Sequence, residues 1–353
     1  MEKIRSAVIG CGRMGAFTSD TMKKYGPKCW FPLSHIEALK ELKSVSLEAI
    51  CDVDSSLLEK AGDEYGVKHT YNNYDKLLSN HKIDLLCVAT RTIGRDKIIQ
   101  AGIENGVKAF HLEKPLCNSM KQLKKLESII SDNKVCLSYG TLRRYLNIYQ
   151  KAKDLADSGK FGKLLQVQVN FGESALFWTH PHSVDLILFF SGKRELKAVQ
   201  SHLSNVVLTR DNIVESDPII EQSIMYFDDG LVGSISKIPG MDVVLGCERG
   251  VITVESNGGK IVIKQALNGA PYFEYSKDLI TDSCNKSQGT YSAISNLLKN
   301  LNNKNYQKNQ FVFLGQKVLF GFVDSHLNNG KLIDIDRVSE KITVLGKTGI
   351  FYA

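Results

Sequence analysis

The sequence predicts an α/β protein of two domains: a doubly wound parallel sheet comes first, and an α/β domain with a mostly antiparallel sheet follows. Short, continuous apolar segments alternate with helical segments through residues 1–137, as in a parallel sheet covered on both faces. Over residues 138–353 most apolar segments follow one another through turns, which favours antiparallel pairing. The length of 353 residues also suits about two domains.

The elements of the first domain follow in a regular order. Strands are predicted at 4–10, 46–54, 83–90, 107–113 and 134–140, and helices at 34–42, 55–66, 94–106 and 119–133. Residues 69–80 continue the alternation. Because the strands are short and apolar almost throughout, we expect them to be buried on both faces.

The pattern changes after residue 137. A helix is predicted at 147–162, and strands at 163–172, 195–210, 218–230, 231–240, 241–250, 251–259 and 260–266. Two further helices are predicted near the end, at 290–303 and 310–330. Successive strands separated by glycine turns indicate hairpins, so this sheet should be largely antiparallel.

The composition favours neither a nucleic-acid nor a membrane partner. The net charge is +7, but Lys and Arg are spread over expected helix faces rather than gathered in a dense block. No apolar segment reaches the length of a membrane span, and the N-terminus enters a strand without a signal-peptide pattern. These features predict a cytoplasmic protein.

The eight cysteines show no metal or disulfide pattern. They lie at positions 11, 29, 51, 87, 117, 136, 247 and 284, and no two are spaced as CxxC. Several fall inside apolar strands. Reduced, buried thiols are therefore expected, with no metal site.

A glycine motif, "AVIGCGRMG", follows the first strand directly. Such glycines allow a tight turn and a close backbone approach to a pyrophosphate, and the N-terminus of the following helix then faces the phosphates. A plain glycine turn is the alternative, but the alternating strands and helices favour a dinucleotide. The expected cofactor-binding residues are Gly10, Cys11, Gly12, Arg13, Met14 and Gly15.

An acidic residue, Asp52, ends the second strand, where dinucleotide-binding folds bind the adenosine ribose. It lies further from the glycines than the usual ~20 residues, because residues 16–33 form an apparent insertion. A carboxylate repels a 2′-phosphate, so NAD is favoured over NADP. Because Arg13 is a cation close by in the sequence, binding of NADP stays an alternative. Alternatively, Asp52 only starts a turn or caps a helix.

The stretch "HLEKPL" ends the fifth strand, and ligands of such sheets bind outside the carboxyl ends of the strands. Lys114 should therefore point into the cofactor crevice. There it could hydrogen-bond a substrate hydroxyl and assist proton transfer. The alternative is an exposed lysine at the end of a strand.

The segments "VIGCGRMG", "AICDVD", "IDLLCVAT", "HLEKPL" and "SGKFGKLLQVQVNFG" together resemble the Gfo/Idh/MocA oxidoreductases. The resemblance covers most of the chain and is strongest over the first 190 residues. It implies an NAD(P)-binding Rossmann domain over residues 1–137. It also implies a domain for substrate binding and oligomerisation over 138–353, with a large open, mostly antiparallel sheet. It further implies that Lys114 is catalytic and that its bond to Pro115 is cis.

The resemblance also places residues in "FWTHPHSVD". Family members commonly carry Asp-x-x-x-His-x-x-Asp here; His182 matches the histidine and Asp185 the later aspartate. His182 is implied as catalytic and Asp185 as substrate-binding. Trp178 replaces the earlier aspartate, which removes a carboxylate, and His180 could partly compensate as a base. Structural roles for His180 and His182 stay open.

Further site residues follow from the same comparison with the family. Arg144 falls where an arginine on the substrate side is common, and Glu113 precedes the catalytic lysine. Thr90 and Arg91 lie in the loop that covers the nicotinamide. In that loop Arg91 replaces a usual proline, and Arg95 replaces a usual histidine.

The resulting hypothesis is an NAD-dependent oxidoreductase that moves a hydride between nicotinamide and a carbon of a sugar, cyclitol or derivative. A non-catalytic dinucleotide-binding regulator and an NAD-dependent glycosidase on the same fold are the alternatives. The substitution at Trp178 favours a regulator, whereas Lys114 and His182 favour an enzyme. A homodimer or homotetramer is expected, because one face of the antiparallel sheet needs cover.

Overall fold

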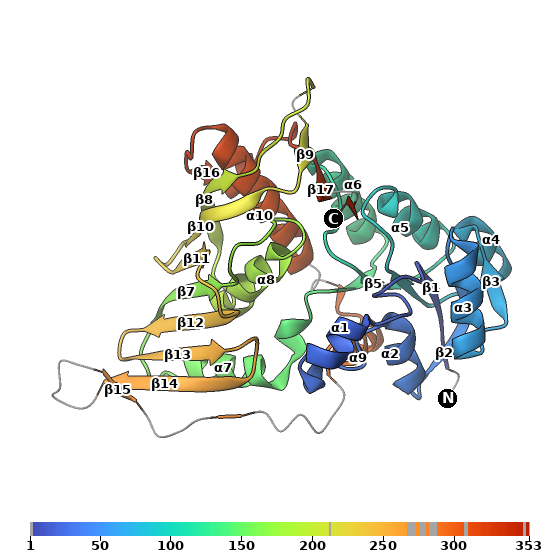
Figure 1. Cartoon of the computed structure of the whole chain (residues 1–353), viewed down its shortest axis with the longest axis horizontal. Coiled ribbons are helices and arrows are strands. Elements are labelled where there is room, and N and C mark those ends of the chain that lie inside the picture. Colours follow the sequence, from blue (N-terminus) through green and yellow to red (C-terminus); the bar gives the residue numbers. More distant parts are fainter. Residues whose placement is uncertain are drawn as a thin grey trace. The chain divides into compact units, whose positions relative to one another are not determined.

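The computed structural model describes residues 3–211, 213–266, 273–275, 280–281, 288–306, 310–348 and 351–352. The chain forms two compact units (Figure 1). One comprises Met1–Leu142 and Asn285–Phe313, and the other Arg143–Cys284 and Leu314–Ala353. The sequence-based division at 137/138 crosses between domains once, whereas these units exchange the chain three times. The reason is that the helix expected at 290–303 belongs to the first unit.

The first unit contains the expected doubly wound sheet. Its six parallel strands have the order β3-β2-β1-β4-β5-β6. They are β1 (Ile4–Ile9), β2 (Val45–Cys51), β3 (His69–Tyr71), β4 (Leu85–Val88), β5 (Ala109–Leu112) and β6 (Cys136–Tyr139). Every residue of β4, β5 and β6 is buried, as their continuous apolar character predicted.

Helices cover this sheet, and one of them comes from late in the chain. They are α2 (His35–Glu41), α3 (Ser55–Tyr65), α4 (Tyr74–Asn80), α5 (Arg95–Glu104), α6 (Met120–Asp132) and α9 (Thr290–Asn302). Helix α9 packs against α2, β5 and β6. Its apolar residues Ile294, Leu297 and Leu298 recur at helical spacing and are buried in the core of this unit.

The insertion 16–33 folds as a separate excursion before α2. It contains α1 (Asp20–Tyr25) and a short 3₁₀ helix, η1 (Lys28–Trp30). The hydroxyl of Thr290 in α9 donates a hydrogen bond to the Leu33 carbonyl over 2.7 Å. The end of the insertion is thereby fixed to α9.

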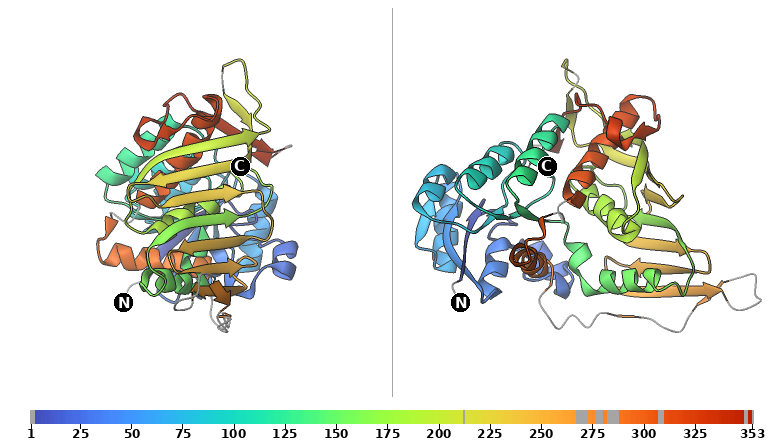
Figure 2. Two further views of the ribbon diagram at one scale, coloured as in Figure 1. Left: turned by 90° about the vertical axis from the view of Figure 1, so that its left-hand side faces the viewer. Right: turned by 180° about the vertical axis from the view of Figure 1, so that it is seen from behind.

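The second unit contains the expected large, mostly antiparallel sheet. Its nine described strands have the order β15-β14-β13-β12-β7-β11-β10-β8-β16, and among them only β7 and β11 pair in parallel. The strands are β7 (Leu164–Asn170), β8 (Leu196–Ser204), β10 (Ile219–Phe227), β11 (Val232–Ser236), β12 (Asp242–Cys247), β13 (Gly250–Glu255), β14 (Lys260–Ala266), β15 (Phe273–Tyr275) and β16 (Ile333–Asp334). The left view of Figure 2 shows these strands side by side.

Helices α7 (Asn147–Asp157), α8 (His180–Ser191) and α10 (Gln310–Leu327) pack beside this sheet (Figure 2). A small third sheet joins β9 (Val214–Ser216), β17 (Val344–Thr348) and β18 (Phe351–Tyr352), which the sequence did not predict. Within the described part of the chain, no helix combines the length and apolar character needed to cross a bilayer. The seven described cysteines are buried free thiols, as expected, and Cys284 lies outside the described residues.

Candidate active site

The glycine loop lies at the carboxyl end of β1 and requires its glycines. Gly10 has φ +97°, and a Cβ there would lie 2.7 Å from the carbonyl carbon of Ala89. A Cβ on Gly15 would lie 1.7 Å from the Gly10 carbonyl oxygen. Around Gly12, by contrast, a Cβ would meet no atom within 4 Å. The loop is therefore closely packed at both ends and open at Gly12, as a cradle for a phosphate would be.

Helix α2, which was expected to face the phosphates after the glycine loop, does not have free N–H groups in its first turn. Helix α2 begins only at His35, whose N–H donates to the Met14 carbonyl over 2.8 Å, and the Ile36 N–H donates to the Gly15 carbonyl over 3.0 Å. The Ser34 hydroxyl accepts from the Glu37 N–H. These bonds use the N–H groups of the first three residues of α2. The expectation that the N-terminus of this helix faces the phosphates is wrong, because those donors are already occupied.

Asp52 lies directly beside the glycine loop. One carboxylate oxygen accepts from the Cys11 backbone N–H over 2.6 Å, and the other accepts from the Asp54 N–H over 2.9 Å. Burial, then the charge of Asp52, raises the pKa of the Cys11 thiol to about 12. Cys11 therefore remains a neutral thiol, and its backbone N–H holds Asp52 against the loop.

Three segments that carry candidate site residues leave the same edge of the parallel sheet. Asp52 follows β2, Thr90 follows β4, and Lys114 follows β5. Because the strands are parallel, these residues share the carboxyl edge with the glycine loop, where ligands of such sheets bind. Lys114 is half-buried, and its bond to Pro115 is cis, as the resemblance implied. Arg91 is exposed.

The guanidinium of Arg95, the first residue of α5, connects two of these segments. It donates hydrogen bonds to the carbonyl oxygens of Glu113, Pro115 and Thr90. Its side chain is almost completely buried, with 1% exposed. Burial lowers the pKa of this guanidinium below its usual value, and the neighbouring Tyr139 and Glu113 oppose that effect.

A buried polar group stands behind Lys114. The Nε2 atom of His35 lies 3.1 Å from a carboxylate oxygen of Glu113, and the ring of His35 packs edge-on against that of His111. His111 binds the Ser138 hydroxyl through Nδ1 over 2.7 Å. Burial lowers the pKa of His111 to about 3. Burial alone would raise the pKa of Glu113, but the bond to His35 and the nearby cations hold it below its usual value.

His35, His111 and Glu113 are also potential metal ligands, because one ligand atom from each lies within 4.8 Å of the others. A divalent ion would add two positive charges to a buried region in which Arg95 and Lys114 already face the single carboxylate of Glu113. Like charges repel strongly at low dielectric constant. The charge balance therefore favours a hydrogen-bonded polar group over a metal site.

In the second unit, two of the expected substrate residues bind each other. The guanidinium of Arg144 forms a forked ion pair with Asp185, with contacts of 3.0 and 2.8 Å to its two carboxylate oxygens. Both side chains are largely buried, with 14% and 5% exposed. Asp185 therefore fixes the orientation of Arg144.

The start of α8 presents the remaining expected residues. His180 is buried, its Nδ1 lies 3.0 Å from the Ser183 hydroxyl, and burial lowers its pKa to about 4. It is therefore neutral near pH 7. His182 is half-buried and Trp178 is exposed. Buried Asp217, which the sequence analysis missed, accepts from the backbone N–H groups of Phe177 and Trp178 over 2.8 and 3.0 Å.

Comparison with known proteins supports the resemblance noted in the sequence. Residues 4–141 match the model of the oxidoreductase family with an NAD-binding Rossmann fold. Over these residues the chain matches the Gfo/Idh/MocA oxidoreductase family.

The sequence relatives of this chain include sugar and cyclitol dehydrogenases. D-apiose dehydrogenase of Rhizobium rhizogenes is 23% identical over 163 residues, which are 46% of this chain and 42% of that protein. scyllo-Inositol 2-dehydrogenase (NAD(+)) of Bacillus subtilis is 22% identical over 248 residues, 66% of each chain. The match to the first of these relatives thus spans less than half of its length.

The fold extends over nearly the whole chain. The crystal structure of an inositol dehydrogenase homologue from Azotobacter vinelandii, complexed with NADH and myo-inositol, has a TM-score of 0.69 and 16% identity. The similarity covers 94% of this chain and 99% of that one. At this identity the likeness shows the fold alone.

Sequence reasoning missed the residues that hold the turn containing Lys114. His35 and His111 were read only as parts of a helix and a strand, and Arg95 only as a substitution for a usual histidine. A charged residue in the first turn of a helix is usually exposed. The available signal for a role of Arg95 was that this arginine replaces a histidine in the loop that covers the nicotinamide in the family.

Proposed function

We propose that this protein is an NAD-dependent dehydrogenase that acts on a hydroxyl-bearing carbon of a sugar, a cyclitol or a derivative. The observation that carries the proposal is the shared carboxyl edge of the first sheet. There the glycine loop, Asp52, Thr90 and Lys114 follow β1, β2, β4 and β5 within the matched family region. The relatives' activities on apiose and inositol support the class of substrate.

The residues of the glycine loop fit a dinucleotide. The loop is open at Gly12, and Asp52 is fixed beside it by the Cys11 N–H. Since the first N–H groups of α2 are occupied, the loop residues 10–15, including exposed Arg13, are assigned to the pyrophosphate. When bound, the nicotinamide carries the hydride. Thr90, Arg91 and Glu113 are assigned to the nicotinamide side of the site.

Asp52 should select NAD over NADP, because its carboxylate repels a 2′-phosphate. Asp52→Ser should narrow the difference between the two dissociation constants, and titration of both cofactors measures it. Asp54→Ser is the matched control, because Asp54 caps α3 and serine also caps helices. Tighter binding of NADP than NAD by the wild type would contradict this assignment.

Two residues are assigned to proton transfer. Lys114 is proposed to hold and help deprotonate the substrate hydroxyl, and His182 is proposed to act as acid and base. Arg144, oriented by Asp185, is assigned to substrate binding, together with Trp178 and His180. His180 would serve there as a neutral hydrogen-bonding group, because burial lowers its pKa and so disfavours the protonated ring.

A panel of sugars, cyclitols and sugar phosphates with NAD, followed at the NADH absorbance, tests the proposed activity. Lys114→Met should reduce turnover by about 10²-fold or more with NAD affinity nearly unchanged, the scale of general acid–base assistance. Lys108→Met, at the other end of β5, is the control. His182→Ala should lower turnover and remove one ionisation from the pH profile. Turnover of Lys114→Met near the wild-type rate would refute the catalytic role.

The regulatory and glycosidase alternatives have less support, because the named relatives with an assigned activity are dehydrogenases. Release of an aglycone without net NADH in the same panel would indicate the glycosidase, and binding of NAD without any turnover would indicate the regulator. We further propose that a homodimer or homotetramer forms through the nine-stranded sheet.

A further inference from the structure

We propose that Arg95 is a positioning residue, which fixes Lys114 by tying the turn 113–115 to the segment after β4. The proposal rests on the function proposed above, in which Lys114 acts on the substrate. For this role the side chain of Arg95 need not touch the substrate, because Arg95 acts through the backbone on either side of Lys114.

The hydrogen bonds of Arg95 are placed for such a role. Its Nη1 atom donates to the carbonyl oxygens of Glu113 and Pro115, the two residues that flank Lys114. Its Nη2 atom donates to the carbonyl oxygen of Thr90. One planar group therefore binds the peptide unit that precedes the lysine and the peptide unit that follows Pro115, and it connects both to the end of β4.

The segment at Thr90 is in turn packed on the glycine loop. A Cβ on Gly10 would lie 2.8 Å from the Ala89 carbonyl oxygen and 2.9 Å from the Thr90 nitrogen. The Ala89 N–H also donates to the Ile9 carbonyl over 2.8 Å. A displacement of Thr90 would therefore displace the loop assigned to the pyrophosphate. Through this contact, Arg95 fixes the position of Lys114 relative to the expected position of the cofactor.

The chemistry of arginine suits this place better than that of other residues. Three carbonyl oxygens in different directions match the fixed fork of a guanidinium, whereas a lysine ammonium is a single point on a flexible chain. Within the described residues, no carboxylate forms an ion pair with Arg95. Its Nε has no hydrogen-bond partner there, so the carbonyls are its principal contacts. Its position is therefore set by the two functional segments.

On the other side of the turn, His35 holds the side chain of Glu113, while Arg95 holds its carbonyl. The residue before Lys114 is thus fixed at two points, and the residue after it at one. A small change in the placement of a reacting group can reduce a rate by about 10²-fold. Loss of the Arg95 contacts should therefore affect chemistry more than cofactor affinity.

The test uses Arg95→Lys, which keeps the charge and loses the fork. Arg5→Lys is the matched control, because Arg5 makes a forked contact with Asp84 at the opposite edge of the same sheet. Amide hydrogen exchange measured by mass spectrometry comes first, since it needs no substrate. Arg95→Lys should speed exchange in both 88–93 and 112–118, whereas Arg5→Lys should leave both unchanged. Faster exchange in only one of these segments would overturn the bridge.

Kinetics with a substrate from the panel then test the positional role. We expect kcat of Arg95→Lys to fall by about 10²-fold, with the KM for NAD within about threefold of wild type and the Tm little changed. A wild-type kcat would overturn the proposal. If Arg95→Lys and Arg95→His both fail to fold, Arg95 is a folding residue and the proposal is again overturned. An inactive wild type refutes the proposed function instead, while the exchange result still decides whether the bridge exists.

Discussion

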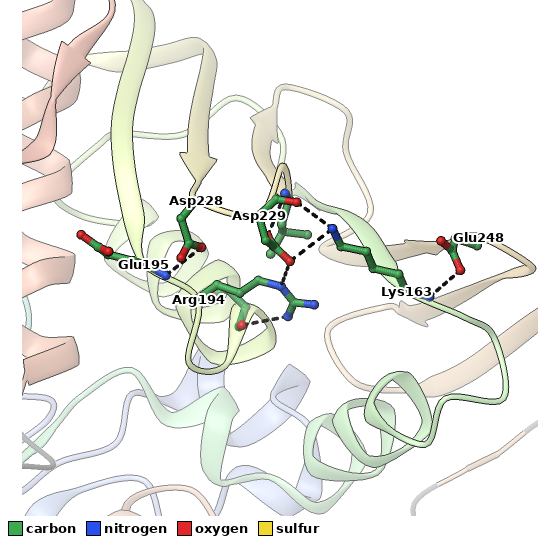
Figure 3. Close-up of polar contacts among 8 residues, drawn as sticks. Lys163, Arg194, Glu195, Asp228, Asp229 and Glu248 are labelled. Carbon is green, nitrogen blue, oxygen red and sulfur yellow. Dashed lines mark hydrogen bonds and ion pairs between the residues drawn. The ribbon is translucent and has the colours of Figure 1, made fainter.

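Two carboxylates, one in each unit, face cations in opposite surroundings. Glu113 lies in the first unit with 5% of its surface exposed, and its partners are the ring of His35 and the nearby charge of Lys114. Asp229 lies in the exposed turn between β10 and β11 (Figure 3). It accepts from Arg194 over 2.8 Å, and the ammonium of Lys163 lies 3.5 Å away.

The pKa of both carboxyl groups is below its usual value, but for different reasons. At Asp229 the hydrogen bond from Arg194 is the principal cause, and the pKa falls to about 2. At Glu113 burial is the largest effect and acts in the opposite direction, so the bond to His35 and the surrounding charges must overcome it. Water can replace a lost partner at Asp229, whereas it cannot at Glu113. A similar direction of pKa shift therefore conceals different consequences for stability.

The largest effect should follow removal of the buried carboxylate. Glu113→Ala leaves His35 and Arg95 without the carboxylate that faces them, so the free energy of unfolding should fall by ~3–5 kcal/mol. Urea denaturation of the purified variant measures this value. A loss below ~1 kcal/mol would place Glu113 in the same class as a surface carboxylate.

An intermediate effect should appear on acidification. His111 has a folded pKa of about 3, whereas the unfolded residue binds a proton near pH 6.5. The unfolded state therefore takes up the proton first, and stability falls as the pH drops from 6.5 towards 3. Between pH 6.5 and 5 this histidine should cost about 2 kcal/mol.

Denaturation at several pH values compares wild type with His111→Gln, which keeps a hydrogen-bonding group beside Ser138. The variant should lose stability less steeply over this range, although buried His180 contributes a similar slope in both proteins. Equal slopes would mean that His111 is protonated in the folded state.

The lowered pKa of Asp229 affects stability only below about pH 4, since its stabilising contribution is present above the unfolded pKa and is lost as the pH falls towards 2.

The smallest effect should follow removal of the exposed carboxylate. In Asp229→Ala, solvent replaces the contacts to Arg194 and Lys163, so the free energy of unfolding should change by no more than ~1 kcal/mol. High salt should reduce the difference further, because it screens exposed charges. Urea denaturation in low salt and in about 1 M salt measures both effects. In 1 M salt the Debye length is about 3 Å, so charges on the surface are strongly screened. A loss above ~2 kcal/mol would remove the contrast with Glu113.

Much of the first sheet and its loops could be predicted from local sequence. Apolar strands alternating with helices gave the parallel sheet, and the glycine spacing located the loop at Gly10. Lys114 was placed at the end of a strand because its neighbours formed a continuous apolar segment. The roles of Asp52 and Lys114 stay predictions, although their positions at the carboxyl edge agree with them.

The sequence by itself determined the fold class, the order of most elements and the placement of the candidate residues at the carboxyl edge, because those depend on local periodicity and on residues adjacent to strand ends. Only the tertiary structure decided which distant residues support that edge. His35 reaches Glu113 across 78 positions, and α9 returns to the first sheet from residue 290. Arg95 is polar by composition, yet it is buried because three carbonyl oxygens converge on its guanidinium. Such convergence depends on how separate segments pack, and local sequence carries no record of it.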